Sequence, residues 1–358
     1  MNGYGIIAPN TFGKITGAPE PICEPMDAIA EAVAWATCTS DPHQVHAGLP
    51  AGLILGHEVV ARLVKVGSMV KDFKVGDIVC VGAVTPDWTW PNCQDNIHQD
   101  ANGAAQGMNW CVTENGTFAE RFRIRQVDCN ATYIPKGLTY EHALMASDMV
   151  TTGFHGVEMA HVTWGDTVVV MGIGPVGLMS VAGSALRGAG RIIAIGRRPI
   201  TLELAKEYGA TDVLNYMDGP IDEQVLELTG GVAPDCCITT GGTNDTFARC
   251  LKMVKPNGIV SNLQAQTFDT EIPGMYTLYW QSHKQVNGGL CPGGRKRMQR
   301  LLSIMEAGRL DPTKLITHRF HGMEHIMDAY NMMDVKPDDM VKPVSYTHLR
   351  AHETSLHL

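Results

Sequence analysis

Val168-Val169-Val170-Met171-Gly172-Ile173-Gly174-Pro175-Val176-Gly177 is the stretch that decides the fold. Its four apolar residues predict a buried strand of the parallel type, and the apolar residues that follow, Val176 to Leu186, predict a helix. Between strand and helix lies a G-x-G-x-x-G pattern, which is typical of a dinucleotide-binding turn in this context. The helix start offers free N–H groups and a positive dipole end to phosphates. Cofactor contacts are therefore predicted at Gly172, Gly174, Pro175, Val176 and Gly177, and a plain strand-to-helix turn is the alternative.

Strands and helices continue to alternate downstream of this turn. Further strands are expected at Arg191 to Ile195, after Ala210 to Leu214, and at Cys236 to Thr239, Ile259 to Leu263 and Val286 to Leu290, with helices at Thr201 to Tyr208, Asp222 to Leu228 and Asp245 to Val254. This alternation predicts an α/β fold whose parallel sheet is covered by helices on both faces. The uncharged run Thr167 to Leu186 has the length of a membrane span, but its glycines and proline favour the strand–turn–helix interpretation.

The flanking segments have a different character. Residues 1–150 contain short apolar stretches broken by glycine and proline, such as Ile54-Leu55, Val59 to Val66 and Asp77 to Val81, and predict a β-rich domain. Helices expected at Arg295 to Ala307 and Ile326 to Met333 return the chain to it, so residues 151–294 form the nucleotide-binding domain and 295–344 complete the first. Residues 345–358 lack apolar periodicity and predict a disordered or non-native tail, with a histidine-based metal-binding tail as the less favoured alternative.

Composition and charge exclude several function classes. The chain has 28 Lys and Arg against 37 Asp and Glu, a net charge of −9, which disfavours nucleic acid and anionic membranes as partners. The N-terminal residues lack the basic and apolar regions of a signal peptide. Ten scattered cysteines in a chain of this length indicate reduced thiols. We therefore expect a cytoplasmic protein.

The end of the second strand predicts which dinucleotide binds. An NAD-preferring site places an acid there to bind the ribose hydroxyls. This chain has Gly196-Arg197-Arg198 instead, and two guanidinium groups can bind a 2′-phosphate. The sequence thus favours NADP(H), although the two arginines could also be solvated loop charges.

Three residues of the first domain have the chemistry of metal ligands. Cys38, His57 and Asp148 supply the sulfur, nitrogen and oxygen atoms that a catalytic zinc takes, with one position left for substrate. The spacing alone does not show that they converge.

At this point the chain resembles a known family. Gly56-His57-Glu58 through Gly67 to Val70 resembles the signature of the zinc-containing alcohol dehydrogenases in the medium-chain dehydrogenase/reductase superfamily, with Ala61 at one signature glycine. The likeness extends to the NADP-dependent secondary alcohol dehydrogenases of anaerobic bacteria and protists through four segments and covers about residues 1–344. These are Cys38-Thr39-Ser40-Asp41, Thr85-Pro86-Asp87-Trp88, Ser147 to Gly156 and Gly172 to Gly183.

The resemblance implies a GroES-like catalytic domain, a Rossmann domain and a homotetramer. It implies zinc held by Cys38, His57 and Asp148, with Glu58 as a displaceable fourth ligand. It also implies contacts to the cofactor's 2′-phosphate from Gly196, Arg197, Arg198 and Tyr216, and from Lys342 to the cofactor. The family commonly has a serine where Arg197 stands. Residues 85–115 contain only Cys93 and Cys111, too few for a four-cysteine structural zinc, so we expect one zinc per chain.

The predicted function is zinc-dependent interconversion of small secondary alcohols and ketones with NADP(H). Ser40 would accept the hydroxyl proton and pass it to His43, unless His43 is a surface histidine of a turn. Trp110 and the segment Ala83 to Trp88 would line the substrate pocket, with core packing as the alternative for Trp110. Thr152 and His155 are weaker candidates for the nicotinamide side.

Two rival functions remain. A quinone or enoyl reductase on the same fold would need no zinc, and its residues would not have to include the four candidate ligands. A non-enzymatic NADPH-binding module would reuse the fold without turnover. A metal assay and a turnover assay distinguish the three.

Overall fold

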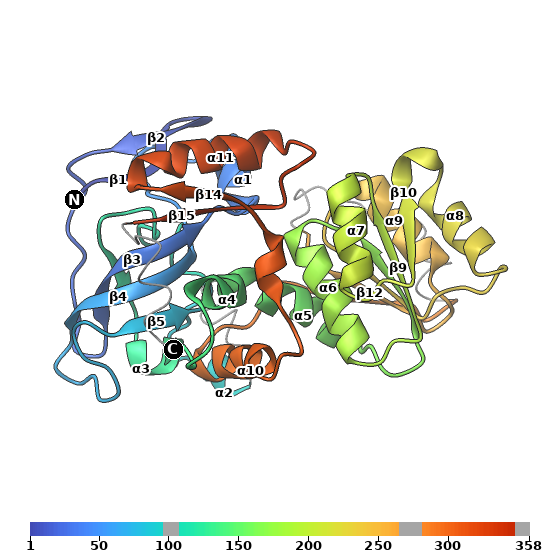
Figure 1. The fold of residues 1–358 in the computed structure, drawn as a ribbon, viewed down its shortest axis with the longest axis horizontal. Coiled ribbons are helices and arrows are strands. Elements are labelled where there is room, and N and C mark those ends of the chain that lie inside the picture. The colour runs from blue at the N-terminus through green and yellow to red at the C-terminus, as the bar shows by residue number, and fades with distance from the viewer. Residues whose placement is uncertain (96–106, 265–280, 348–358) are drawn as a thin grey trace. The chain divides into compact units, whose positions relative to one another are not determined.

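The structure, a computed structural model, describes residues 1–95, 107–264 and 281–347. The chain forms two compact units, of which one comprises Met1–Thr151 with Cys291–Leu358 and the other Thr152–Leu290 (Figure 1). The nucleotide-binding domain expected to end at residue 294 therefore ends four residues earlier. The physical reason is that Pro292 and Gly293 pack on the first unit: Thr151 Oγ1 donates to the Pro292 carbonyl at 2.9 Å, and Gly293 lies against the Val84 backbone.

The second unit is built on a six-stranded parallel sheet with the order β10-β9-β8-β11-β12-β13. Its strands are β8 (Thr167–Met171), β9 (Arg191–Gly196), β10 (Asp212–Asn215), β11 (Cys236–Thr239), β12 (Ile259–Asn262) and β13 (Gln285–Gly288). The connecting helices are α6 (Pro175–Leu186), α7 (Pro199–Glu207), α8 (Ile221–Leu228) and α9 (Asn244–Met253). The strand order reverses between β8 and β11, which is where open α/β sheets bind their ligands.

Side-chain alternation explains how this sheet is covered. Val169, Ile193 and Cys237 point to one face, where they pack with residues of α8 and α9 in a buried cluster. Their neighbours along each strand are equally buried on the other face. Strands that are apolar on both faces are stable only when helices cover both sides, as the sequence pattern predicts.

The first unit is built on a seven-stranded, mostly antiparallel sheet with the order β14-β15-β3-β4-β5-β7, in which β6 also pairs with β3. Its strands are β3 (Ala28–Ala36), β4 (Glu58–Val66), β5 (Ile78–Val81), β6 (Phe122–Ile124), β7 (Ala131–Tyr133), β14 (Ile316–His321) and β15 (Lys342–Tyr346). A ribbon of β1 (Gly3–Ala8) and β2 (Thr11–Ile15) is added.

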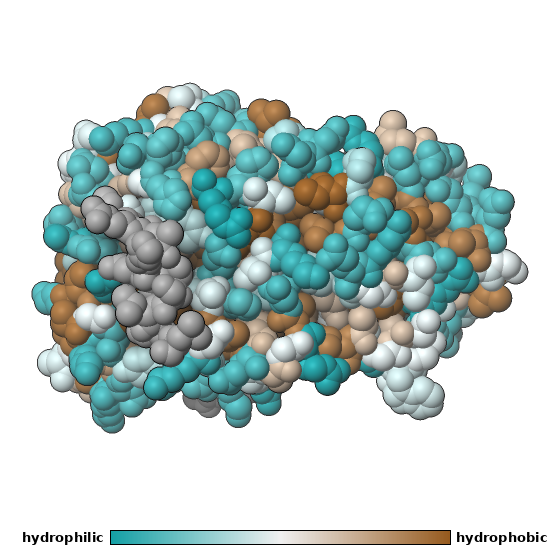
Figure 2. Space-filling view, in the orientation of Figure 1, coloured by the Kyte–Doolittle hydropathy of each residue, from teal (hydrophilic) through white to brown (hydrophobic). Residues whose placement is uncertain are grey.

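Short helices and turns surround this sheet. They are α1 (Ser40–His46), α2 (Pro91–Gln94), α3 (Val127–Asn130), α4 (Tyr140–Met145), the π-helix η2 (Ala146–Val150), α5 (Thr151–Met159), which leads into the second unit, α10 (Arg295–Glu306) and α11 (Ile326–Val335). Hydrophilic residues make up most of the face shown in Figure 2. Within the described residues, no helix is long and apolar enough to cross a membrane.

Two local expectations are wrong. The tail expected from residue 345 starts later, because Ser345 and Tyr346 belong to β15 and are buried against β3, where Tyr346 pairs with Ala34. Residues 348–358 of that tail lie outside the described residues. The segment expected as a polar turn around His43 is helix α1, since buried Val45 anchors it to the core.

Candidate active site

The strand pairing of the first unit brings the candidate metal ligands together. Cys38 follows β3, and His57 and Glu58 stand at the start of β4. Because β3 and β4 are antiparallel neighbours with Ala36 opposite Glu58, the end of one strand meets the beginning of the other. Asp148 comes from the π-helix η2, and such wide turns frequently occur at functional sites.

The four side chains form one cluster. Ligand atoms of Cys38, His57, Glu58 and Asp148 all lie within 4.8 Å of one another. Cys38 Sγ is 3.5 Å from Asp148 Oδ2, and His57 Nε2 is 3.7 Å from the same oxygen. Three of the four residues are buried, and Cys38 is half-buried. The structure thus shows that the four side chains converge, which their spacing in the sequence alone does not show.

The electrostatics of the cluster favour a cation. Burial raises the pKa of Glu58 to about 7, although the Lys342 ammonium opposes this shift. Burial also raises the pKa of the Cys38 thiol, and the Asp148 carboxylate adds to the effect. His57 changes in the opposite sense: burial opposes its charge, but hydrogen bonding to Asp148 raises its pKa well above 6.5. Anions crowded in a buried site are stabilised by a bound cation.

The donor set tests which cation fits. A thiolate, an imidazole and two carboxylates match the preferences of zinc, whereas magnesium and calcium take oxygen ligands. Glu58 Oε2 is buried and has no hydrogen-bond partner in the part of the chain described, so this oxygen is available to bind a cation. The residues present fit zinc.

Asp41 supports this cluster and was not identified from the sequence. Its Oδ2 accepts a hydrogen bond from the Cys38 backbone N–H at 2.9 Å, and its Oδ1 lies 3.7 Å from His57 Nδ1. A carboxylate on the far nitrogen of a metal-binding histidine fixes the orientation of the ring. One feature of the sequence could have identified Asp41, namely its position three residues after Cys38. At this spacing its carboxylate can turn back and accept a hydrogen bond from the Cys38 N–H.

Lys342 lies beside the metal-ligand cluster, and its predicted contact with the cofactor stays a prediction. It is 1% exposed, and its Nζ donates to Glu58 Oε1 at 2.7 Å. The reason is the register of β15, which places Lys342 opposite Ile316 in the interior of the sheet. Its ammonium offsets part of the negative charge of the cluster.

Ser40 and His43, the predicted proton relay, both lie on α1. Ser40 Oγ is 3.4 Å from His57 Nε2, so the hydroxyl reaches the metal-ligand cluster. His43 is exposed, and among the described residues the structure records no hydrogen bond between the two side chains. Partial burial lowers the pKa of His43, and the nearby charge of Lys336 adds to this effect. The imidazole is therefore neutral at pH 7 and able to accept a proton.

The glycine turn of the second unit has the geometry of a phosphate site. Gly172 has φ of +89°, which favours glycine, and Gly177 packs against the Gly172 carbonyl with no room for a Cβ. A Cβ at Gly174 would meet nothing within 4 Å, so its backbone is open to a ligand. Pro175 and Val176 form the first turn of α6.

The candidate 2′-phosphate residues lie at the ends of two neighbouring strands. Gly196 ends β9 and pairs with Asn215 at the end of β10, so Arg197 and Arg198 lie at the same sheet edge as Tyr216. Arg197 and Tyr216 are exposed, and Arg198 is half-buried. The Ile173 side chain of the glycine turn occupies the space that a Cβ at Gly196 would need. Pairing of β9 with β10 thus creates one polar edge beside the glycine turn.

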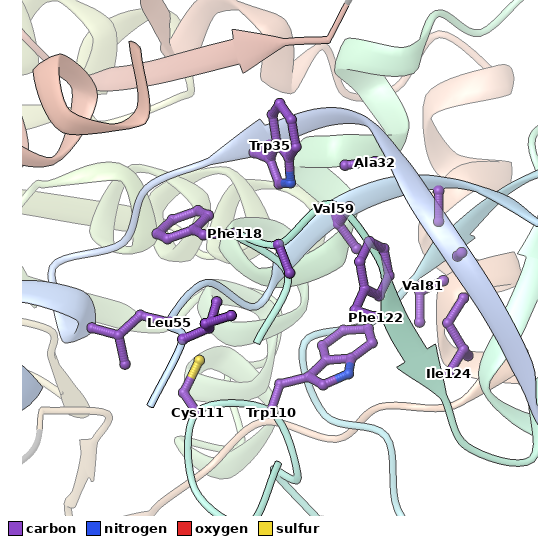
Figure 3. Close-up of a cluster of buried hydrophobic side chains, with 14 of the residues drawn as sticks. Ala32, Trp35, Leu55, Val59, Val81, Trp110, Cys111, Phe118, Phe122 and Ile124 are labelled. Carbon is purple, nitrogen blue, oxygen red and sulfur yellow. The ribbon is translucent and has the colours of Figure 1, made fainter. Parts of the chain in front are cut away.

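Trp110 packs in the hydrophobic core of the first unit, as Figure 3 shows, and its predicted contact with substrate stays a prediction. Its side chain is 1% exposed, its ring meets Phe122 edge-on at 5.7 Å, and its Nε1 donates to the Arg123 carbonyl at 2.8 Å. Both the apolar face and the polar edge of the indole are therefore satisfied inside the protein. In the Ala83 to Trp88 segment, Ala83 is buried and donates its N–H to the Ser147 carbonyl next to Asp148.

Thr152 and His155 lie on α5. His155 is buried, with Nδ1 3.8 Å from Glu158 Oε2, and Thr152 is half-buried. A contact of either residue with nicotinamide stays a prediction.

Comparison with known protein families matches both parts of the chain. The alcohol dehydrogenase GroES-like domain matches residues 24–135, and the zinc-binding dehydrogenase family matches residues 175–307. The chain belongs to the zinc-binding alcohol dehydrogenase family. The matched ranges of this dehydrogenase include Cys38, His57 and Glu58 in the first and the start of α6 in the second.

Curated relatives and solved structures agree with this assignment. The dehydrogenase is 45% identical over 350 residues to the NADP-dependent isopropanol dehydrogenase of Thermoanaerobacter brockii, covering 96% of this chain and 99% of the relative. It is 45% identical over 359 residues to the protein of the same name from Entamoeba histolytica, covering 99% and 98%. Among solved structures it is similar to the zinc-dependent alcohol dehydrogenase 2 from Streptococcus pneumonia, with a TM-score of 0.85, 25% identity and coverage of 98% and 99%.

Proposed function

We propose that this dehydrogenase interconverts small secondary alcohols and ketones, using NADP(H) and one zinc ion per chain. The observation that carries the proposal is the buried cluster of Cys38, His57, Glu58 and Asp148. The relatives at 45% identity, which are named NADP-dependent isopropanol dehydrogenases, support the choice of cofactor and substrate class. A zinc-free reductase would have no use for this buried set of anions.

Cys38, His57 and Asp148 would hold the zinc, with Glu58 as a displaceable fourth ligand. Zinc lowers the pKa of an alcohol hydroxyl and polarises a ketone, and NADP(H) accepts or supplies the hydride. Asp41 Oδ1, 3.7 Å from His57 Nδ1, lies where a carboxylate would orient the ring from its far side. Lys342, bound to Glu58 Oε1, limits how far Glu58 can move while Oε2 stays available.

Ser40 and His43 would move the proton. The Ser40 hydroxyl, at the metal-ligand cluster, accepts the proton of the alcohol and passes it towards His43. His43 is exposed and neutral at pH 7, so it can accept that proton and release it to water. In the reductive direction the same groups return the proton to the product oxygen.

The cofactor would lie on the second unit. Backbone N–H groups at Gly174 to Gly177 and the start of α6 bind the pyrophosphate. The 2′-phosphate binds at the neighbouring strand ends, to Arg197, Arg198 and the Tyr216 hydroxyl. The positive charge of the two arginines attracts the phosphate.

The first test follows absorbance at 340 nm with acetone, comparing NADPH with NADH on zinc-loaded protein. We expect rapid oxidation of NADPH and much slower oxidation of NADH. Replacing Arg198 with serine should raise KM for NADPH by about tenfold or more, since a charge-assisted contact is worth about 1.5–3 kcal/mol, and leave KM for NADH nearly unchanged. Equal effects on both cofactors would refute the 2′-phosphate role.

The second test is the metal content of Cys38→Ala. Zinc and turnover should both be lost, whereas Cys80→Ala should keep both, because Cys80 is buried away from the cluster with its Sγ on the Ala143 carbonyl. A zinc-replete, active Cys38→Ala protein would overturn the ligand assignment.

We also propose a homotetramer in the cytoplasm, as the family resemblance implies. Light scattering coupled to size exclusion tests the assembly, and a stable, active monomer would contradict it.

A further inference from the structure

His57 contacts a second group of ligand-type side chains, on the side of its ring that faces away from the metal-ligand cluster. Atoms of Asp41, His57 and Cys111 lie within 4.8 Å of one another, and all three residues are buried. They are 0%, 2% and 1% exposed. The metal-ligand cluster does not include Cys111.

The two groups use different nitrogens of the same imidazole. Nε2 lies 3.7 Å from Asp148 Oδ2, whereas Nδ1 lies 3.7 Å from Asp41 Oδ1. Because the ring nitrogens point in divergent directions, both can be ligated at once. A ligand on Nδ1 therefore need not displace one on Nε2.

Unused donor atoms point into the second group. Asp41 Oδ1 and His57 Nδ1 are both buried and lack a hydrogen-bond partner within the described ranges. A buried polar atom without a partner is costly and calls for a ligand or an ion. At 3.7 Å the two atoms are too far apart to satisfy each other with a hydrogen bond.

Cys111 supplies the third donor from a fixed position. It has φ of +64°, an uncommon conformation for a residue other than glycine, and its N–H donates to the Glu114 carbonyl at 3.0 Å. The side chain extends into the buried cluster near Leu55 (Figure 3). Its Sγ donates to the Gly56 carbonyl at 3.1 Å, which is adjacent to His57 in the chain.

We propose that Asp41, His57 and Cys111 form a second metal site, which takes a thiophilic divalent cation such as Zn²⁺ or Cd²⁺ and inhibits the enzyme. One sulfur, one nitrogen and one carboxylate oxygen are the donors such cations prefer. Binding forms three bonds to the cation and releases two protons to water, one from the Cys111 thiol and one from His57 Nδ1. Because both cations would then share His57, the charge and geometry at the first site change while its zinc stays bound, and turnover falls.

The test uses the zinc-loaded protein and Cd²⁺ as the probe. After equilibration and removal of unbound ions, zinc and cadmium are counted separately per chain, and the ultraviolet thiolate-to-cadmium absorption is recorded. We expect zinc to stay at one equivalent, cadmium to rise to one, the absorption band to appear and turnover to fall by tenfold or more. Loss of zinc in step with cadmium uptake, or no uptake, would overturn the proposal.

Two variants assign the site. Cys111→Ser should keep its zinc, bind no cadmium, show no thiolate band and resist inhibition. Cys80→Ser, a matched buried cysteine outside both groups, should behave as wild type. Asp41→Asn is the second variant, for use if Cys111→Ser fails to fold. It keeps an oxygen for the Cys38 N–H and should weaken cadmium binding at least tenfold. Full cadmium uptake by either variant would refute the site. Zinc content and turnover without cadmium report on the proposed function separately.

Discussion

Replacing Lys342 with methionine should destabilise the metal-free protein strongly. The substitution keeps a linear side chain of similar length and removes the ammonium that donates to Glu58 Oε1 at 2.7 Å. Both side chains are at most 1% exposed, and Glu58 Oε2 has no other partner among the residues described. The variant therefore leaves a buried carboxylate without its counter-charge.

The magnitude follows from this burial. Removing one partner of a buried ion pair costs about 3–5 kcal/mol, because the other charge stays desolvated. Glu58 can escape part of this cost by taking up a proton, since its pKa is already about 7 in the presence of Lys342. We therefore expect the lower end, about 3 kcal/mol. In a unit of this size, each kcal/mol lowers Tm by about 2–4 °C, so Tm should fall by about 6–12 °C.

The assay is thermal and urea unfolding of metal-free protein, because a bound cation would add its own stabilisation. The set comprises wild type, Lys342→Met, Glu58→Met and the double variant. The double variant should recover most of the loss, since a well-packed apolar pair can replace a buried ion pair. Lys206→Met is the matched control: its pair with Glu203 is exposed and should be worth less than about 1 kcal/mol. If Lys342→Met were no more harmful than Lys206→Met, the reasoning would be refuted.

The pH dependence follows from the same pair. The pKa of Glu58 is raised from 4.5 to about 7, so the folded protein holds more protons than the unfolded chain between these values. Stability of the metal-free protein should therefore fall as pH rises from about 4.5 to 7, by at most about 3 kcal/mol from this group. Lys342→Met should extend the fall to higher pH, and Glu58→Met should abolish this contribution.

Three further substitutions test other parts of the structure. Gly177→Ala should lower the stability of the second unit by about 1–3 kcal/mol in urea unfolding, because its Cβ would collide with the Gly172 carbonyl. Gly174→Ala should fold normally, since its Cβ meets nothing, but raise the Kd for NADPH in a fluorescence titration; equal stabilities for the two variants would contradict this account. Hydrogen bonds from Arg319 and Tyr346 hold the pKa of Glu141 below its usual value, although burial opposes the ionisation of this carboxyl. The ionised contact therefore stabilises the protein above about pH 4.5, and this stabilisation is lost as pH falls. Glu141→Gln should thus cost about 1–2 kcal/mol at pH 7 and less at pH 4, and an equal loss at both would argue against the ionised contact.

The sequence predicted the second unit well because its signals are local. A strand buried on both faces, a glycine turn and an amphipathic helix each occupy a few consecutive residues, so β8, the turn and α6 could be placed from one stretch. The metal-ligand cluster needed more. Cys38, His57 and Asp148 have the right chemistry, but their convergence depends on the pairing of β3 with β4 and on a π-helical turn that no local pattern marks.

The features that the sequence did not predict share a cause, which is that side-chain environment is a long-range property. An indole such as Trp110 suits a pocket or a core equally well, and its packing against Phe122 depends on a distant part of the chain. Lys342 is separated from Glu58 by most of the chain, and nothing near it in sequence indicates a buried partner. Ser345 and Tyr346 form a strand because β3 and β14 provide edges to pair with.

The position of β15 in the sheet has a consequence for synthesis on the ribosome. The second unit is one continuous segment, so all its strands leave the ribosome before the last strand of the first unit does. Until β15 emerges, the end of β3 at residues 34–36 lacks a neighbour on one side and Glu58 lacks its counter-charge. A nascent chain that stops short of Lys342 would therefore carry a finished nucleotide-binding unit beside an open sheet edge, a combination that chaperones and proteases can recognise as incomplete.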